Sequence, residues 1–357
     1  MVQSLLKYQT ILVVRPDGMG DLVMTIPFLR ELRRNCPTAN ITLLVHAAHE
    51  EFMKNCPYVD AVLGIPLKRH HRPGFFKILN FCRKHLWTHR WDAALYPRWD
   101  VDHYGGAFLS FISGATFRAG FSAASTPLKQ KRDKFFNLFF NHIIYDTGQK
   151  HEIDRNLFFL ENLGGHIQNR SLEFWPNPEA RQQADEVLDH PHLQGKLLAV
   201  GIGASHPLKL WPIKSWIQLI KLYLNNDNGN RVMLLGGADV RNHGDAISMG
   251  LSETEQIRLM NLTGQSSWLL SQALLEKCCL YIGNDTGLSH IAAALNKPSL
   301  ILFGWPISAD PKHPLAPERF QPWGPLVKIV RPPQQSKPSA ANISIQSVWA
   351  ELQSLMS

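Results

Sequence analysis

The stretch ILVVRPDGMGDL, residues 11–22, predicts the fold of the first half of the chain. Its four leading apolar residues are typical of a strand buried on both faces, and the glycines that follow permit a tight turn into a helix. Residues 22–35 have the apolar period of a helix, which Pro37 ends, and a second apolar run follows at 41–45. This order predicts a strand–helix–strand unit of a parallel sheet.

The same alternation continues along the chain and then begins again. We expect a further strand at 93–96 and helices at 104–113 and 152–163. The periodicity breaks near residues 174–178, and a second series starts after Lys196. Its expected strands cover 197–202, 231–235, 279–282 and 299–303, and its expected helices cover 213–224, 240–249, 268–277, 288–295 and 343–356. The pattern predicts an α/β protein of two Rossmann-like domains, residues 1–178 and 179–357.

Composition limits the class of protein. The 357 residues are 45% hydrophobic and 18% charged, as in ordinary globular proteins. Five cysteines, an odd number without C-x-x-C spacing, favour a reduced intracellular protein. The N-terminus lacks the pattern of a signal peptide, and no run approaches the ~18 apolar residues that span a bilayer. We therefore expect a cytoplasmic protein, either soluble or peripheral at the inner face of the cytoplasmic membrane.

The net charge of +8, from 37 basic and 29 acidic residues, indicates an anionic partner. Much of the excess lies between Asp60 and Asp92, where basic residues alternate with aromatic ones and no acid occurs. The basic residues are Lys68, Arg69, Arg72, Lys77, Arg83, Lys84 and Arg90. This pattern fits an anionic lipid acceptor at a membrane surface, with Arg69 and Arg72 on the acceptor side. A solvated basic helix is the alternative; nucleic acid is disfavoured, because no recognised binding module is present.

The turn after the first predicted strand contains Asp17, Gly18, Gly20 and Asp21. It differs from the dinucleotide fingerprint G-x-G-x-x-G, because the third glycine is missing and no suitably placed acid ends the second strand. A nicotinamide-dependent oxidoreductase is therefore disfavoured. Asp21 either caps the helix or faces a ligand in the cleft beyond the strand ends.

Residues 282–290, IGNDTGLSH, form a second candidate turn, again between a strand and a helix. Backbone N–H groups around Thr286 and Gly287 could bind a diphosphate, since a helix N-terminus attracts anions. His290 stands five residues after Asp285 and could face the same cleft. The alternative for His290 is a purely structural role.

A third Gly-rich turn, residues 201–212, contains Ser205 and Lys209 and leads to a helix that Pro212 is well placed to start. We include Ser205 in the predicted donor site. Lys209 could neutralise a leaving phosphate; a solvated surface lysine is the alternative.

Together these motifs resemble a known family. The combination of G-D at Gly20-Asp21, K-x-W-P from Lys209, a G-G turn at 236–237, L-T-G at 262–264 and D-T-G-x-x-H from Asp285 is similar to glycosyltransferase family 9. These are the heptosyltransferases that extend the inner core of bacterial lipopolysaccharide. The resemblance extends from about residue 11 to about residue 330.

The resemblance implies a GT-B fold, with parallel sheets facing an interdomain cleft, the acceptor on the N-terminal domain and the nucleotide sugar on the C-terminal one. It also implies roles: general base for Asp21, phosphate-binding lysine for Lys209, and donor binding for Asp285, Thr286, Gly287 and His290. Several family members have small hydroxyl residues where this chain has residues 15–17, so Asp17 competes with Asp21 for the role of base.

The implied reaction is an inverting transfer of a heptose from ADP-heptose, with no cofactor and no metal. Asp21 would take the proton of the attacking hydroxyl, while Lys209 and the helix start after Asp285 stabilise the leaving diphosphate. Asp100 and Asp102 form a D-x-D triplet, for which we favour a solvated loop over a metal site. Two alternatives stay open: transfer of a different sugar to another glycan or protein, and an inactive relative that binds nucleotide sugars.

Overall fold

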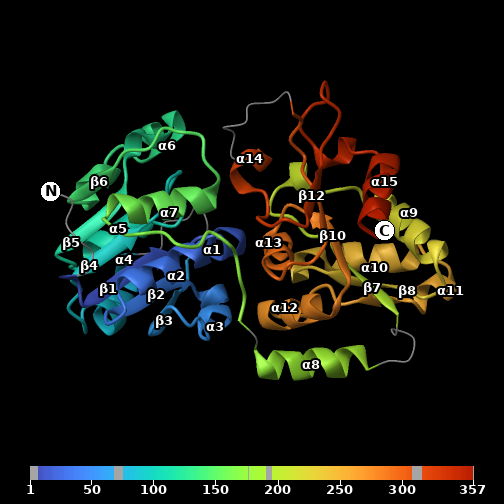
Figure 1. The fold of residues 1–357 in the computed structure, drawn as a ribbon, viewed down its shortest axis with the longest axis horizontal. Helices are drawn as coiled ribbons and strands as arrows, with labels where there is room; N and C mark the ends of the chain where they lie inside the picture. Colours follow the sequence, from blue (N-terminus) through green and yellow to red (C-terminus); the bar gives the residue numbers. More distant parts are fainter. Residues whose placement is uncertain (1–6, 68–74, 176, 190–194, 308–315, 357) are drawn as a thin grey trace. The chain divides into compact units, whose positions relative to one another are not determined.

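The computed structural model describes residues 7–67, 75–175, 177–189, 195–307 and 316–356. The chain forms two compact units, residues 1–171 and 172–357 (Figure 1). The sequence predicted a domain boundary between residues 178 and 179. The boundary between the units lies between residues 171 and 172, before α8 (Pro178–Leu188). The reason is packing, because α8 lies against α12 (Trp268–Lys277), whose Gln272 donates from Nε2 to the Trp175 carbonyl at 3.0 Å.

The first unit is built on a parallel sheet of six strands in the described residues, with the order β3-β2-β1-β4-β5-β6. Each neighbouring pair runs parallel. The strands are β1 (Thr10–Arg15), β2 (Asn40–His46), β3 (Ala61–Ile65), β4 (Ala93–Tyr96), β5 (Phe117–Phe121) and β6 (His142–Ile144). The apolar side chains of β1, β2, β4 and β5 are buried, as expected for a parallel sheet covered on both faces, whereas most of those on the edge strands β3 and β6 are not.

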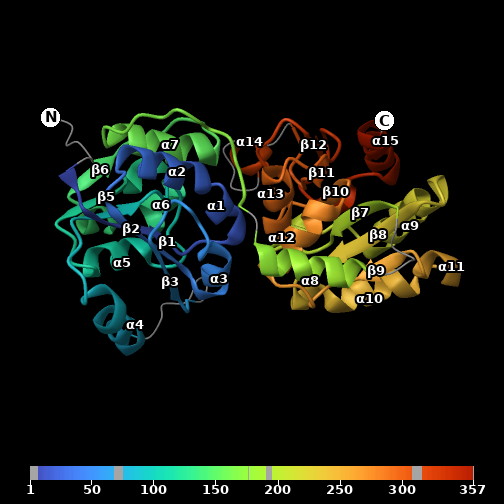
Figure 2. The ribbon, with the colours of Figure 1, turned by 60° about the horizontal axis from the view of Figure 1, so that its bottom comes forward.

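Helices cover both faces of this first sheet. The helices are α1 (Met19–Val23), α2 (Ile26–Asn35), η2 (Ala47–His49), α3 (Glu50–Met53), α4 (Phe75–Phe81), η3 (Cys82–Leu86), α5 (Gly106–Ile112), η4 (Ala123–Ser125), α6 (Pro127–Arg132), η5 (Phe136–Phe139) and α7 (Glu152–Asn162). Figure 2 shows α2 and α7 together on one side of the sheet and α4 and α5 on the other.

The second unit repeats this plan, with a parallel sheet in the order β12-β11-β10-β7-β8-β9. The strands are β7 (Lys196–Gly201), β8 (Asn230–Leu235), β9 (Leu259–Asn261), β10 (Leu280–Asn284), β11 (Ser299–Leu302) and β12 (Val327–Val330). Counted from its own first strand, each sheet has the order 3-2-1-4-5-6, which is that of the Rossmann fold. The prediction of two Rossmann-like parallel sheets is confirmed.

The helices of the second unit follow its strands in the same way. Besides α8 and α12 they are η7 (Pro207–Lys209), α9 (Ile213–Asn226), η8 (Ala238–Val240), α10 (Arg241–Met249), α11 (Glu253–Gln256), α13 (Gly287–Ala294), α14 (Pro317–Phe320), η9 (Ala340–Asn342) and α15 (Ile345–Met356). Across the ranges that the structure describes, no helix combines the length and apolarity needed to cross a membrane.

One predicted helix is divided in two. The sequence predicted a single helix over 22–35, but α1 ends at Val23 and α2 begins at Ile26. Pro27 explains the break, because it has no N–H to donate to the carbonyl one turn earlier and occupies the first turn of α2. The Thr25 hydroxyl instead donates to the Asp21 carbonyl at 2.8 Å, which fixes the chain just after the predicted site.

Candidate functional site

The predicted site residues gather at corresponding places in the two sheets. In each sheet the first strand lies between the second and the fourth, so the chain leaves it on one side and returns on the other. Open α/β sheets bind ligands outside the carboxyl ends of the strands at this switch point. Asp17 and Asp21 follow β1 at the first switch point. Lys209 and Asp285 follow β7 and β10 at the second.

Buried charges crowd the first switch point. Arg15, the last residue of β1, is fully buried, and its Nε lies 3.4 Å from Asp17 Oδ2. Its guanidinium also reaches Glu152, at 3.3 Å, and donates to the Pro97 carbonyl at 3.1 Å. Arg98, which follows β4, lies 3.3 Å from Asp17 and 3.2 Å from Asp21. The two arginines therefore hold both candidate carboxylates, as buried charges must be paired.

Helix α7 supplies the outer support of this cluster. Glu152, its first residue, is buried and contacts Arg15 with one oxygen and Arg155 with the other, at 3.3 and 3.4 Å. Arg155 in turn lies 3.4 Å from Asp146 and stacks over the Trp99 ring at 3.7 Å. The network leaves Arg15 little freedom to move toward a ligand.

Asp17 and Asp21 differ in how far solvent reaches them. The Asp17 side chain is 1% exposed and lies between the two arginines, whereas the Asp21 side chain is 23% exposed. Asp21 Oδ1 accepts from Arg98, and among the described residues Oδ2 accepts no hydrogen bond. Asp21 can therefore present one oxygen to a ligand, and Asp17 cannot do so without moving.

Burial raises the pKa of Asp21, although Arg98 and Arg15 oppose the rise and Asp17 and Glu152 add to it. A carboxylate whose pKa moves toward neutrality is a better proton acceptor at physiological pH than an ordinary aspartate. Arg98 and Arg15 lower the pKa of Asp21 and so limit the rise that burial causes. The arrangement suits a general base.

The glycines before Asp21 shape the turn, and the capping alternative for Asp21 is wrong. Gly18 occupies the N-cap position of α1, and its carbonyl accepts from Leu22 at 3.0 Å, while Gly20 accepts from Met24 at 3.0 Å. Asp21 stands inside the first turn and makes no capping bond. Its carboxylate is engaged by Arg98 instead.

Arg69 and Arg72, which the sequence predicted on the acceptor side, lie outside the described residues. The remainder of that basic segment forms α4 and η3. Phe76 there is 82% exposed and Trp87 is 47% exposed. Trp91, in contrast, is buried and donates to the Leu86 carbonyl at 2.9 Å. The exposed basic side chains beside them are Lys77, Arg83, Lys84 and Arg90.

Sequence reasoning missed Arg15, Arg98 and Glu152 as members of the first site. A signal existed for Arg98, because it comes just after a predicted strand, where side chains of neighbouring parallel strands meet. Its use required knowing that β4 lies beside β1. Nothing in the local sequence distinguishes Glu152 from the first acidic residue of any helix.

The D-x-D triplet is structural, and its expected role as a solvated loop is wrong. Asp100 is buried, and Asp102 accepts hydrogen bonds from four successive backbone N–H groups at the start of α5. Tyr96 also donates to it at 3.0 Å. Among the described residues, no group of three His, Cys, Asp or Glu side chains is arranged to hold a metal ion.

The second switch point joins Lys209 to Asp285. Lys209 ends η7, and its Nζ lies 2.5 Å from Asp285 Oδ2, with the two side chains 18% and 5% exposed. The sequence placed these residues in one donor site, 76 positions apart by number, and the structure brings them into contact. Within the pair Lys209 is the more accessible side chain, since Asp285 is buried.

The backbone around this pair is held by buried side chains. Asn284 donates to the Ile202 carbonyl at 2.9 Å and accepts from the Trp211 backbone at 3.2 Å, which connects the ends of β7 and β10. Glycine is required at Gly201 and Gly283, because a Cβ at either would collide with the Tyr281 hydroxyl. The turn is therefore fixed before any ligand binds.

Helix α13 begins at this turn. Thr286 is its N-cap and Gly287 its first residue, and both residues are partly accessible. The first N–H groups of a helix have no partner within the helix. His290 is buried within the helix at 3% exposure. Ser205 is exposed in the loop before η7. A helix start and an ammonium group together suit an anion such as a diphosphate.

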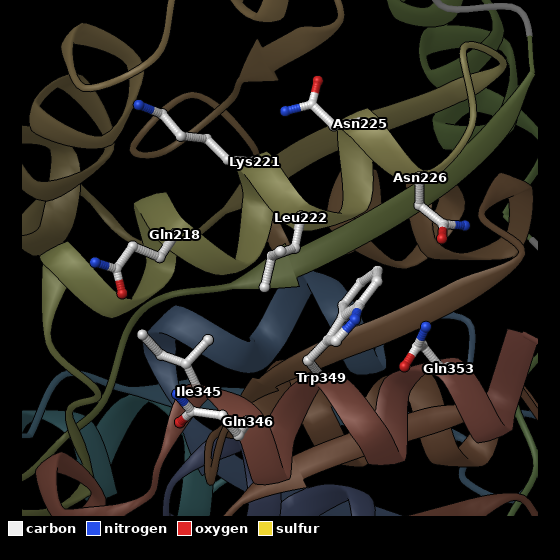
Figure 3. A pocket seen from close by; sticks show the side chains of 9 residues that line it. All are labelled: Gln218, Lys221, Leu222, Asn225, Asn226, Ile345, Gln346, Trp349 and Gln353. Atoms are coloured by element: carbon white, nitrogen blue, oxygen red, sulfur yellow. The ribbon is translucent and has the colours of Figure 1, made fainter.

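A separate pocket of about 590 Å³ lies between α9 and α15 (Figure 3). Its described lining is mostly carboxamide and apolar side chains: Gln218, Lys221, Leu222, Asn225, Asn226, Ile345, Gln346, Trp349 and Gln353. None of the predicted site residues contributes to it. Its described lining contains no acid, and Lys221 is its one charged side chain, so we do not assign it a part in catalysis.

Comparison with known proteins decides the family. The sequence profile of glycosyltransferase family 9 (heptosyltransferase) matches residues 83–349, three quarters of the chain. The chain belongs to glycosyltransferase family 9. This glycosyltransferase carries Lys209 and the 285–290 block inside the matched segment, whereas Asp21 precedes it. The recognition made from sequence motifs, and the prediction of a glycosyltransferase, are confirmed.

Named relatives of this glycosyltransferase are similar over most of their length. It is 24% identical over 316 residues to lipopolysaccharide heptosyltransferase 2 of Escherichia coli (strain K12), covering 86% of this chain and 85% of that protein. A family 9 structure from Veillonella parvula DSM 2008 has a TM-score of 0.79 at 20% identity and 98% coverage of both chains. The structure of E. coli ADP-heptose lps heptosyltransferase II has a TM-score of 0.76 at 20% identity, with 97% and 98% covered. The GT-B fold class is confirmed.

Proposed function

We propose that this enzyme transfers a heptose from ADP-heptose to an anionic glycolipid acceptor of the lipopolysaccharide-core type. The observation that carries the proposal is the different chemistry of the two switch points. The first has the partly exposed carboxylate of Asp21 after β1, and the second has the Lys209–Asp285 pair at a helix start after β10. The name of the E. coli relative, a lipopolysaccharide heptosyltransferase, supports the choice of sugar and acceptor.

In the acceptor half, Asp21 is the proposed general base. Its Oδ2 accepts the proton of the attacking hydroxyl while Oδ1 stays with Arg98, so the carboxylate keeps its orientation through the reaction. Arg15 and Arg98 also stabilise the charge of Asp17. We propose that Asp17 in turn positions these two arginines. Gly18 and Gly20 let the acceptor approach the backbone closely.

In the donor half, Lys209 and the N-terminus of α13 stabilise the departing diphosphate. The ammonium leaves Asp285 in part to meet the phosphate, and the first N–H groups of α13 donate to it. Together these positive groups do the work for which other enzymes use a divalent cation, so we propose a reaction without a resident metal or cofactor. A single direct displacement of this kind inverts the anomeric carbon.

The acceptor is proposed to be anionic and lipid-linked, which would bring the enzyme to the cytoplasmic face of a membrane. The exposed basic side chains of α4 and η3 support this, since Lys77, Arg83 and Lys84 face solvent beside the exposed Phe76. Arg69 and Arg72 are proposed to add to the same acceptor side.

A donor panel tests the proposal. The purified chain is incubated with an acceptor glycolipid and, in separate reactions, with ADP-heptose, ADP-glucose, UDP-glucose and GDP-mannose, and product is measured by mass spectrometry. We expect turnover with ADP-heptose alone. Turnover with another donor and none with ADP-heptose would favour the alternative of a different sugar. Binding of a donor without turnover of any acceptor would favour an inactive relative.

A further inference from the structure

One surface of the first unit has no part in the proposed chemistry and exposes several large apolar side chains. The α6–η5 surface consists of the exposed side chains from Leu128 to Leu138, on α6 and the segment that ends in η5. Three of them are large and apolar: Leu128, Phe135 and Leu138, at 48%, 65% and 73% exposure. Exposed apolar side chains are normal singly, but a group of them in one short segment marks a contact surface. Figure 1 shows α6 on the outer border of its unit.

The charged side chains that the α6–η5 surface exposes to solvent are positive. Lys131, Arg132 and Lys134 are exposed between the apolar side chains. The acid of the segment, Asp133, is turned toward the protein, where its carboxylate accepts from the Asp102 backbone at 2.9 Å. Apolar side chains interleaved with basic ones are typical of segments that lie in the interface of an anionic bilayer.

The inner side of α6 reaches the first switch point. Lys129 is fully buried, and its ammonium donates to the carbonyls of Arg98, Trp99 and Phe121 at 3.2, 3.0 and 3.3 Å. Its three N–H groups are thereby all used. Helix α6 thus connects an outward apolar and basic surface to the backbone that carries Arg98, the partner of Asp21.

We propose that the α6–η5 surface docks on an anionic lipid bilayer. The inference rests on the proposed function in one respect: a lipid-linked acceptor requires that the enzyme contact a membrane. Phe111 extends the surface, since it is 46% exposed and its ring lies 5.6 Å from that of Phe139 in η5. Self-association through the surface is disfavoured, because a two-fold contact would bring like charges together.

Vesicle binding tests the inference with the full chain. We compare co-sedimentation with vesicles of phosphatidylglycerol and phosphatidylethanolamine and with vesicles of phosphatidylcholine. The wild type should bind the anionic vesicles and lose binding as salt is raised. F135S/L138S should bind them about tenfold more weakly or worse, since it removes two interfacial side chains. K131E/K134E should lose binding as well.

A matched pair in the second unit is the control. M249S/I257S removes two apolar side chains of similar exposure, 81% and 57%, and should bind vesicles as the wild type does. Thermal unfolding of each variant shows whether it is folded. The inference is overturned if the wild type does not bind anionic vesicles, if folded F135S/L138S binds as well as the control, or if the surface instead mediates dimers in sedimentation. Turnover of a delipidated, soluble acceptor by F135S/L138S tests the proposed function separately.

Discussion

The two switch points have the same position in the same topology and different chemistry. The first contains two arginines and three acids within contact distance, and its pKa-shifted carboxylate is partly open to solvent. The second contains one Lys–Asp pair beside a helix start. Strand order gives both units a switch point at the same place, while the side chains after the strand ends give each its chemistry, proton transfer and anion binding in the function proposed above.

Replacing the proposed base should have the largest effect. Asp21→Asn keeps the shape of the side chain and removes the proton acceptor, so kcat should fall by about 10³-fold while the affinity for ADP stays unchanged. Steady-state kinetics and calorimetric titration measure the two quantities. Asp17→Asn is the matched comparison and should lower kcat much less. A larger loss of kcat in Asp17→Asn than in Asp21→Asn would make Asp17 the base. Solvent exposure of the carboxylate would then not identify the base.

The backbone of the first switch point should depend on the buried Lys129 ammonium, as that of the second depends on the Asn284 carboxamide. Lys129→Met leaves three buried carbonyls without a donor, so the free energy of unfolding should fall by about 3 kcal/mol. Burial lowers the pKa of Lys129 to about 7. Between pH 7 and the ordinary value of 10.5 the unfolded chain then binds more protons, so the wild type should gain stability over the variant as pH rises.

Denaturant unfolding at pH 7 and pH 10 measures both parts of this prediction. Lys131→Met, on the exposed side of the same helix, is the control and should change stability by less than about 0.5 kcal/mol. Equal stability of the two variants would show that the three hydrogen bonds contribute little.

Removing Lys209, the proposed phosphate-binding lysine, should affect the proposed donor half only. Lys209→Met should lower kcat/KM by about 100-fold, because one positive group is lost from the stabilised diphosphate. ADP should also bind more weakly, which the Asp21→Asn variant should not show. Lys214→Met, at an exposed position on α9, serves as the control for loss of a lysine. Unchanged ADP affinity in Lys209→Met would show that the lysine does not bind the donor, and the second switch point would then not be an anion site.

The smallest effect expected is on the pH profile of kcat/KM. Arg98 lowers the pKa of Asp21 and Asp17 raises it. The proposed base must be ionised to act, so Arg98→Met should move the acidic limb to higher pH and Asp17→Asn should move it to lower pH, each by up to about 1 unit. Arg98→Lys, which keeps the charge, should move it less. Shifts of the same sign in Arg98→Met and Asp17→Asn would exclude Asp21 as the titrating group.

Much of the fold follows from local pattern. The predicted strand at 93–96 and the helix at 268–277 agree with β4 and α12 at both ends, because uniform apolar runs and clear helix starts carry their own signals. Strands such as β3 (Ala61–Ile65) and β6 (His142–Ile144) were not predicted. Each is short and lies near the edge of the first sheet, where pairing with one neighbour, rather than composition, makes the segment a strand.

The sequence by itself determined the repeated strand–helix alternation, the glycine turns and the residues of the donor motif, since each depends on neighbours within a few positions. Only the tertiary structure decided that Arg98 meets Asp21, 77 positions away, that Glu152 holds Arg15, and that Lys129 supports the backbone between them. These contacts exist because β4 pairs with β1 and because α6 and α7 pack beside the strand ends. Buried charges find their partners through that packing, and no local pattern encodes it.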